Sequence, residues 1–415
     1  MNKNFKICLL LLISSTYLFS QSFLKKSDNS PHKLFLDEAY IDNIKKSLNN
    51  GEMFVSSTFY QIKNDMDIEV EFIVSNTTSE FVDDIDTQSF INSGYDISDE
   101  AIFPDNNLII SEPMFFRGIV VRQITFIPFT YNFNTKQLTT FEGVEINVNE
   151  VQSNLNLDYN EIKLSRAFEP LYESSIINYQ RSDRDDDYQS PSILYICGGS
   201  SMSHPYVQDL LEWRHKTGYI VNAVSTSEIG GSGTASIKNY IQNAYDNWEN
   251  PPEIVGLIGD TGGSYSIGYY TEGWSGYNGA GDFPYCQLDG SDLLPEVFIG
   301  RISVNSSSDL SNVLNKTLAY EKATYINQTG TDWYEKSSIV GDPSSSGQST
   351  IITGEYIENI LDVYGFEDIN TNFGNGNYDN WMENELEDGS LYMSYRGYYG
   401  ASGFGSGEIN GANNG

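Results

Sequence analysis

The segment from Glu253 to Arg301 limits the folds open to this chain more than any other. It begins with the apolar run EIVGLIGD, continues through a Gly- and Tyr-rich loop, and closes with DFPYCQLDGSDLLPEVFIGR. A short apolar run of this kind is typical of a buried strand in a parallel sheet. Such a strand delivers its last residue, here Asp260, to the carboxyl edge of the sheet, where open α/β folds build their sites.

Strand and helix patterns alternate on both sides of this segment. ILYIC and YIVNAV read as strands, and a helix beginning at Thr234 places Ile237, Ile241 and Tyr245 on one face. A second round runs from the strand SSIVGD through two helical segments to the strand SLYMSY. This order predicts α/β architecture with parallel sheets.

The chain before residue 179 has a different period. Runs such as DIEVEFIVS and LTTFEGVEINVNEV alternate β-branched or aromatic residues with polar ones, and FNTKQLTTFEG reads as a hairpin. We therefore expect an all-β sandwich. The stretch QRSDRDDDYQSPS that follows is free of apolar side chains, and Arg181 and Arg184 make it either a site of proteolysis or an uncleaved linker.

Composition and the first residues indicate an exported protein. Residues 1–21 carry two lysines and then the apolar run ICLLLLISSTYLF, which is the pattern of a secretory signal peptide and is too short to span a membrane. The formal net charge of −34 argues against nucleic acid and anionic membranes as partners. Only Cys197 and Cys286 remain after the signal, so no disulfide framework is expected.

The acidic residues of the central segment form a candidate cation site. Asp289, Asp292 and Glu296 fall within eight positions just before the apolar run VFIGRISV, and Asp260 ends the earlier strand. Hard carboxylate oxygens beside a rigid strand suit Ca²⁺. The alternative is a solvated loop whose carboxylates cap local turns.

The order of these motifs resembles the catalytic domain of the gingipain-type cysteine peptidases, which are caspase-like in fold. The resemblance covers roughly residues 190–415 and is most specific at LDGSDLLPEVFIGRI, while residues 52–151 are similar to the β-rich propeptide of that family. It implies two adjacent α/β subdomains preceded by a propeptide sandwich that inhibits the enzyme. It also implies structural calcium, with carboxylates from Asp292 and Glu296, Asp260 as a further candidate, and backbone carbonyls around Asp289 and Leu294.

The resemblance also places the catalytic positions. Family members use a histidine in a Tyr-x-Gly-His-Gly type loop after a strand, and here Tyr398 fills that slot in YRGYYG. A phenol is a poor general base at neutral pH. The family's acid matches Asp342 of SSIVGD, whose alternative role is to cap a turn or helix. The nucleophilic cysteine would lie beyond Gly415.

Other chemistry is weakly indicated. Cys197 and His204 share a loop, so a Cys–His pair is conceivable, although thiols at strand ends are usually core residues. The Gly-rich loops lack the spacings of nucleotide-binding motifs. The aromatic loop from Tyr265 to Tyr277 would suit sugar stacking but leaves the α/β half without a role.

Two functions follow from these patterns. The first is a secreted, propeptide-bearing cysteine endopeptidase acting on proteins or peptides, and the second is a non-catalytic surface or binding protein on the same scaffold, indicated by Tyr398. The last strand pattern has no closing strands after it, so we expect these 415 residues to be the front part of a longer protein. The predicted domains are a signal peptide (1–21), an N-terminal arm (22–50), a β-sandwich (51–178), a cleavable linker (179–192) and two α/β subdomains (193–330 and 331–415).

Overall fold

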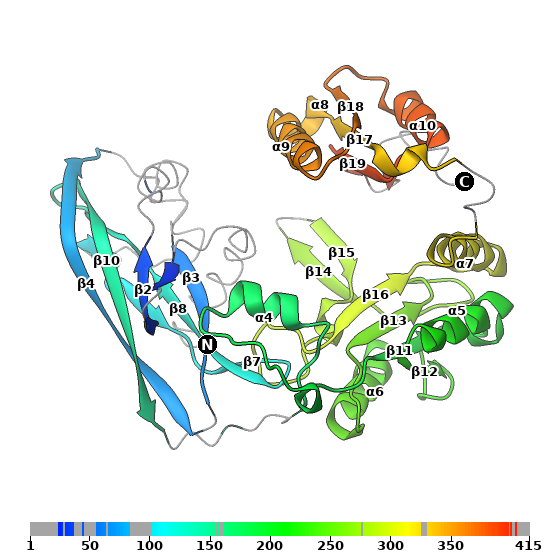
Figure 1. Ribbon diagram of the computed structural model, residues 1–415, viewed down its shortest axis with the longest axis horizontal. Coiled ribbons are helices and arrows are strands. Elements are labelled where there is room, and N and C mark those ends of the chain that lie inside the picture. Colours follow the sequence, from blue (N-terminus) through cyan, green and yellow to red (C-terminus); the bar gives the residue numbers. More distant parts are fainter. Residues whose placement is uncertain are drawn as a thin grey trace. The chain divides into compact units, whose positions relative to one another are not determined.

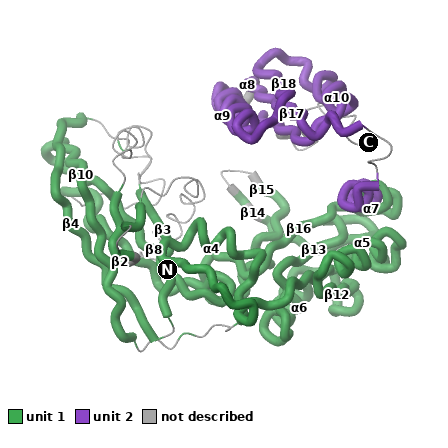
Figure 2. The backbone as a smooth tube through the Cα atoms, viewed as in Figure 1, with its two compact units in different colours: residues 1–314 green, residues 315–415 purple. Residues whose placement is uncertain are grey.

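A computed structural model of the chain is shown in Figure 1. It describes residues 24–27, 30–36, 44, 55–63, 65–83, 101–153, 157, 162–274, 277–324, 330–397, 399–400 and 403–404. The predicted signal peptide and most of the N-terminal arm lie outside these residues. The chain divides into two compact units, Met1–Leu314 and Asn315–Gly415 (Figure 2). The division falls earlier than the predicted subdomain boundary at residue 330.

The first unit begins with two antiparallel sheets, which we call the β-domain. One sheet has the order β1-β2-β10-β9-β5 with β4 also paired to β10, and the other has the order β3-β8-β6 with β7 paired to β8. Their strands are β1 (Leu24–Ser27), β2 (Ser30–Leu36), β3 (Ser56–Gln61), β4 (Met66–Phe81), β5 (Ile102–Phe103), β6 (Leu108–Ile110), β7 (Met114–Phe116), β8 (Ile119–Phe126), β9 (Phe129–Asn132) and β10 (Gln137–Gln152).

The period-two pattern of the sequence explains how these sheets pack. Along β10, Leu138, Val144, Ile146 and Val148 are buried while most of the residues between them are partly or fully exposed. Residues of both sheets share one core, which confirms the strand-rich domain that the sequence predicts. The predicted hairpin is also present, because β9 and β10 pair antiparallel.

Helix α4 (Glu169–Ser175) covers the outer side of β8 and was not predicted. Phe168 and Tyr172 are fully buried there, in one cluster with Ile119 and Val121 of β8. The amide of Ile177 then donates to the carbonyl oxygen of Phe59 at 2.9 Å. The helix therefore belongs to the β-domain by packing.

The predicted linker is less open than its composition indicates. It contains the short 3₁₀ helix η2 (Asp185–Asp187), and Tyr188 and Gln189 after it are buried. The amide of Gln189 donates to the carbonyl oxygen of Leu164 at 3.0 Å. The part that carries Arg181 and Arg184 is exposed, as are Ser190 and Pro191, whereas Tyr188, Gln189 and Ser192 are buried and belong to the folded structure.

A parallel sheet with the order β12-β11-β13-β16 completes the first unit and confirms the α/β prediction. Helix α6 packs the predicted stripe of Ile237, Ile241 and Tyr245 against the apolar strands. The elements are β11 (Ser192–Cys197), η3 (Ser201–Ser203), α5 (Pro205–Lys216), β12 (Ile220–Ser225), α6 (Thr234–Asn247), β13 (Ile254–Ile258), the unpredicted hairpin β14 (Tyr270–Trp274) and β15 (Tyr277–Gly281), η4 (Phe283–Tyr285) and β16 (Phe298–Ile302). Helix α7 (Ser307–Glu321) begins in the first unit and contains the boundary after Leu314.

The second unit contains another parallel sheet, with the order β18-β17-β19. Val340 of β17 packs with Tyr378 and Met382 of helix α10 in a small core. The elements are η5 (Asp332–Glu335), β17 (Lys336–Gly341), α8 (Pro343–Ser346), α9 (Ser349–Val363), β18 (Asp368–Phe373), α10 (Tyr378–Asp388), β19 (Tyr392–Arg396) and the pair β20 (Tyr399–Gly400) and β21 (Gly403–Phe404). In neither unit do the described residues include a helix long and apolar enough to cross a membrane.

Candidate functional site

The carboxyl ends of β17 and β19 place the predicted acid Asp342 beside Arg396 and Gly397. Gly341 pairs with Arg396, and the amide of the next residue, Asp342, donates to the carbonyl oxygen of Arg396 at 2.8 Å. A Cβ added to Gly397 would lie 2.9 Å from the Cβ of Asp342 and 2.6 Å from the hydroxyl of Tyr395. Only glycine fits at position 397 without displacing these side chains, so the chain leading to position 398 passes directly over Asp342.

Asp342 also has the capping role that the sequence left open. Its side chain is buried, and Oδ1 accepts hydrogen bonds from the amide of Ser344 at 2.9 Å and from the Ser344 hydroxyl. These bonds begin α8. The predicted role as a catalytic acid remains a prediction, because Tyr398 lies outside the described residues.

The two cysteines of the described residues are buried thiols. Cys197 is fully buried at the end of β11 and Cys286 is 3% exposed. Burial raises the pKa of each thiol to about 12. His204 does not face Cys197 as a base, because its Nε2 lies 3.1 Å from the Ser307 hydroxyl and its Nδ1 accepts from the amide of Tyr206. Neither thiol has the thiolate character that a nucleophile needs at neutral pH.

The structure divides the predicted cation ligands between opposite edges of the first parallel sheet. Asp260 follows β13, so it lies at the carboxyl edge, where Oδ1 accepts from the Thr261 amide at 2.7 Å and the Ser303 hydroxyl at 3.0 Å. These hydrogen bonds, the Thr261 amide first, lower the pKa of Asp260. Glu296 precedes β16, which runs parallel to β13, and so lies at the amino edge. Asp260 therefore does not share a site with the other four residues.

The remaining candidates lie on one loop that we call the acidic loop, residues 289–296. Oδ1 and Oδ2 of Asp292 accept from the amides of Leu294 and Phe115, both at 2.8 Å, and Oδ2 of Asp289 accepts from the Tyr245 hydroxyl at 2.9 Å. The side chain of Leu294 packs in the core beneath α4. Most of the carboxylate oxygens are thus directed at donors of the protein itself.

The acidic loop holds carboxyl groups whose charged form is unfavourable. Oε2 of Glu296 accepts from the Leu288 amide at 2.5 Å, whereas Oε1 is buried and has no hydrogen-bond partner among the described residues. Burial, with the charges of Asp292 and Asp289 adding to it, raises the pKa of Glu296 to about 8. Burial likewise raises the pKa of Asp292 to about 6.

The acidic loop has one feature that suits a bound cation and one that does not. The orphan oxygen of Glu296 could donate a lone pair to a metal ion. The neighbouring carbonyl oxygens of Gln287 and, at 2.6 Å, Pro284 already accept hydrogen bonds from Nζ of Lys238, which is itself a cation. Within the described parts of the chain, no three His, Cys, Asp or Glu side chains are grouped so that they could hold a metal ion. Calcium binding at the acidic loop remains a prediction.

Two arginines with little solvent exposure, Arg301 and Arg117, make contacts that the sequence did not predict. Arg301 of β16 donates to both carboxylate oxygens of Asp282 at 2.8 and 2.7 Å and to the carbonyl oxygens of Gly259, Ile267 and Gly268 at 3.0 to 3.2 Å. It fastens the loop that follows Asp260. Arg117, at the turn between β7 and β8, is fully buried against the acidic loop. The sequence singles out Arg301 only as part of the motif FIGRI and gives no signal for Arg117.

Comparison with known protein families gives two adjacent matches. Residues 186–414 match the model of Peptidase family C25, and residues 55–184 match the model of the propeptide of the same family. The first match covers more than half of the chain, and its described part includes both parallel sheets, the acidic loop and Asp342.

Individual relatives are more distant. The chain is 26% identical over 287 residues to Gingipain R2 of Porphyromonas gingivalis, a match that covers 66% of this chain and 37% of the relative. It is 26% identical over 295 residues to Lys-gingipain of the same organism, covering 63% of this chain and 16% of the relative. The chain therefore spans about a third of the length of Gingipain R2, and less of Lys-gingipain.

Solved structures are also similar. The crystal structure of the Arg-specific cysteine proteinase gingipain R superposes with a TM-score of 0.44 at 22% identity, covering 56% of this chain and 51% of that one. The complex of the Porphyromonas gingivalis RgpB pro- and mature domains gives a TM-score of 0.43 at 22% identity, covering 52% and 50%. Scores of this size carry no weight for function by themselves.

Proposed function

Since the chain belongs to peptidase family C25, we propose that it functions in proteolysis as the zymogen of an exported cysteine endopeptidase, with protein or peptide substrates. The observation that carries this proposal is the family match over residues 186–414. The geometry at the ends of β17 and β19 supports it, because Asp342 lies beside the residues that lead to the position of the family's histidine. The apolar run within residues 1–21 supports export.

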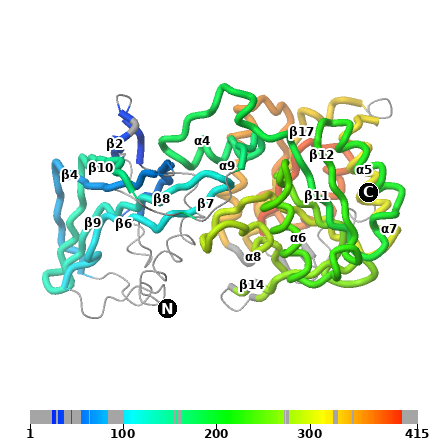
Figure 3. Tube along the Cα trace, turned by 90° about the horizontal axis from the view of Figure 1, so that it is seen from below, coloured from blue at the N-terminus to red at the C-terminus, as the bar shows by residue number. Residues whose placement is uncertain are grey.

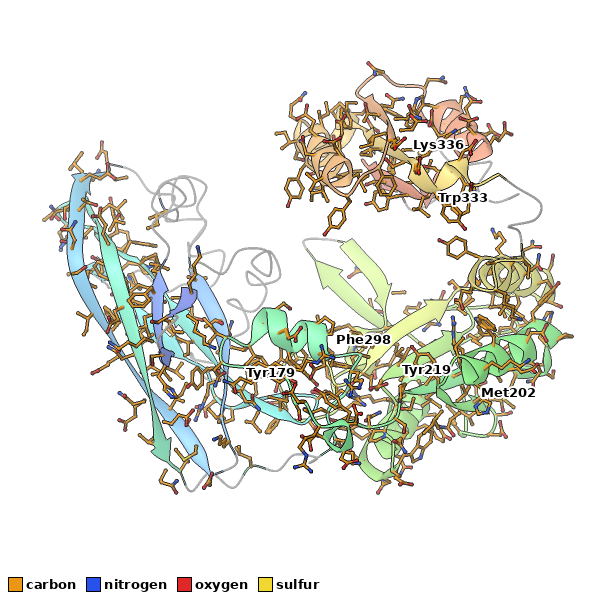
Figure 4. The ribbon with its side chains drawn as sticks, viewed as in Figure 1. Tyr179, Met202, Tyr219, Phe298, Trp333 and Lys336 are labelled. Carbon is orange, nitrogen blue, oxygen red and sulfur yellow. The ribbon has the colours of Figure 1, made fainter. Side chains whose placement is uncertain are left out.

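The β-domain acts in this proposal as an intramolecular propeptide. The match of residues 55–184 to the C25 propeptide supports that role. So does the packing of the β-domain on the α/β sheet, where the Phe115 amide donates to Asp292 and the rings of Phe168 and Phe298 lie 4.2 Å apart. Phe298 is labelled in Figure 4, close to α4. A domain held by such contacts stays close to the enzyme that it inhibits.

A binding protein on the same scaffold is the second candidate, and Tyr398 favours it. A tyrosine with a pKa near 10 cannot serve as a general base matched to neutral pH. Neither described cysteine can replace a dedicated nucleophile, because the pKa of both thiols is raised to about 12. The activity of the complete protein separates the two candidates.

The test is hydrolysis of peptide substrates at pH 7.5 by the full-length gene product and its Tyr398→His variant, each measured after removal of the β-domain that the proposal treats as an inhibitor. We expect weak turnover by the native protein and an increase of about 10²–10⁴-fold in kcat/KM on restoring the family's histidine, the usual contribution of a general base. Tyr399→His is the matched control, because it places a histidine one residue away and should leave turnover at the native level.

Asp342→Asn in the Tyr398→His background tests the acid. Asparagine caps a helix about as well as aspartate, so the melting temperature should be unchanged while turnover falls. Native turnover as high as that of the histidine variant would refute the binding-protein candidate and assign the base to another residue. No turnover by either protein, with both folded, would sink the peptidase proposal.

A further inference from the structure

The turn between β7 and β8 has an unusual residue at its tip. Arg117 and Gly118 both have positive φ, at 45° and 76°, as in the tight two-residue turns of β-hairpins. Glycine, asparagine and aspartate favour this conformation, whereas a long side chain adopts it rarely. In the view of Figure 3, β7 and β8 extend from the β-domain toward the α/β sheet. Arg117 thus has an unfavourable backbone conformation, and its side chain is directed at the α/β sheet.

The guanidinium group of Arg117 is enclosed by acceptors of the α/β sheet. Nη1 donates to the carbonyl oxygens of Pro252, at 2.9 Å, and of Glu296. Nη2 donates to Oε1 of Gln189 at 3.0 Å and to the carbonyl oxygen of Pro251 at 3.2 Å. Pro251 and Pro252 lie just before β13 and Glu296 just before β16, so we call this set the amino-edge cage.

Aromatic rings cover the same guanidinium. Its central carbon lies 5.2 Å from the ring centre of Phe168 and 5.9 Å from that of Tyr245. Arg117 is fully buried, and it is the largest of the fully buried side chains of the described residues. Planar donors in a fixed fork match several carbonyl oxygens at once, which the single ammonium of a lysine cannot do.

The contacts of Arg117 join segments that lie on either side of an exposed part of the linker. Arg181 and Arg184 have side chains that are 55% and 76% exposed. A cut there leaves Arg117 and Phe168 on the β-domain, and it leaves the whole amino-edge cage on the α/β sheet. Other polar contacts also cross the cut, among them the bond of the Phe115 amide to Asp292 at 2.8 Å, that of the Tyr188 hydroxyl to Glu169 at 2.9 Å and the backbone bonds of Leu164 to Asp187 and Gln189. Arg117 differs from these residues because one side chain makes four of the crossing hydrogen bonds.

We propose that Arg117 is the anchor that holds the β-domain on the amino edge of the α/β sheet after the linker is cut. The partner of this anchor is the cage of carbonyl oxygens, which would recognise an arginine presented on a hairpin turn. The inference rests on the proposed function in that it treats the β-domain as a propeptide that is cut from the chain. It adds that retention uses the amino edge, whereas Asp260 occupies the carboxyl edge of the same sheet.

Retention can be measured on the complete chain. A recognition sequence for a sequence-specific endopeptidase is inserted between Asp183 and Arg184, and the protein is bound to a column by a tag at its carboxyl end. After cleavage on the column, the rate at which the β-domain fragment leaves is followed. We expect slow release from the native sequence and at least 30-fold faster release from Arg117→Gln and Arg117→Lys, which is about 2 kcal/mol at 1.4 kcal/mol per factor of ten.

Two further variants distinguish loss of the Arg117 contact from general destabilisation of the β-domain. Arg122→Gln removes another largely buried arginine, one that pairs with Asp67 inside the β-domain at 2.6 Å, and its fragment should stay bound. Gln189→Ala removes an acceptor from the cage and leaves the β-domain sequence intact, so it should also speed release. Uncut Arg117→Gln should keep a cooperative melting transition.

The outcomes are distinct from those of the activity test. Immediate release of the native fragment, or native-like retention in both Arg117 variants, would overturn the anchor. Release from Arg122→Gln as fast as from Arg117→Gln would show that general weakening of the β-domain is the cause, and it would overturn the anchor as well. None of these readouts uses peptidase activity, so the anchor can fail while the proposed function stands, and the proposed function can fail while the anchor stands.

Discussion

Arg301→Ala is the substitution from which we expect the largest loss of stability in the first unit. The guanidinium group of Arg301 joins Asp282 to three carbonyl oxygens of the loop that follows β13. The two side chains are only 11% and 19% exposed, so water replaces little of what is lost. Alanine at position 301 removes a donor from the Asp282 carboxylate and from three carbonyl oxygens, of which that of Gly268 keeps the Tyr285 hydroxyl as a donor.

The magnitude follows from that burial. Removing one partner of a buried ion pair destabilises a protein by about 3–5 kcal/mol, and we take the lower end because Asp282 keeps some contact with water. A change of 1 kcal/mol shifts the melting temperature by about 2 °C in a cooperative unit of this size. The first transition should therefore fall by roughly 6 °C.

Differential scanning calorimetry of the complete chain is the assay. Asp282→Asn keeps one acceptor oxygen and should give an intermediate decrease. Lys216→Ala is the matched control, because it removes a pair with Glu212 in which both side chains are 61% exposed. Exposed pairs of this kind contribute only about 0.3–0.5 kcal/mol. If Arg301→Ala and Lys216→Ala melted at the same temperature, the argument from the Arg301 contacts would be wrong.

Two further predictions concern the thiols and the acidic loop. With a pKa near 12, Cys197 and Cys286 keep their protons until the pH approaches that value. Neither thiol should therefore react with iodoacetamide at pH 8 in the native protein, whereas both should react in 6 M guanidinium chloride. Labelling of the native protein at the rate of a free thiol would contradict their burial. Calcium at a hundred times its Kd should stabilise the first unit by about 2.7 kcal/mol relative to EDTA through the orphan oxygen of Glu296. Asp292→Asn combined with Glu296→Gln should abolish that gain while Asp260→Asn keeps it, and equal gains in all three proteins would exclude the acidic loop as the site.

The strand and helix patterns predicted most of the fold because their causes are local. Alternation in β10 and the stripe on α6 follow from which side chains each element buries. The neighbourhood of Asp342 was also predictable, because parallel strands end at one edge of a sheet. The same rule separates Asp260 from Glu296, since the first follows its strand and the second precedes its own; treating them as one site overlooked that direction.

The remaining features depend on contacts between distant segments. Helix α4 has the polar sequence EPLYESS, and Tyr172 is buried there only because β8 and Phe116 pack against it. Arg117 carries no local signal at all, because its acceptors come from three separate segments of the chain. The burial of Tyr188 and Gln189 at the end of a charged linker likewise depends on segments that the local pattern does not show.

Arg117 is synthesised well before the acceptors that surround it in the folded protein. Glu296 is synthesised 179 residues after Arg117. At translation rates of about 5–20 residues per second, that interval lasts roughly 10–35 s. During this time the amino-edge cage is incomplete, because the carbonyl oxygen of Glu296 is one of the acceptors of Arg117. Arg117 can therefore take up its fully buried position only after nearly the whole of the first unit has been synthesised.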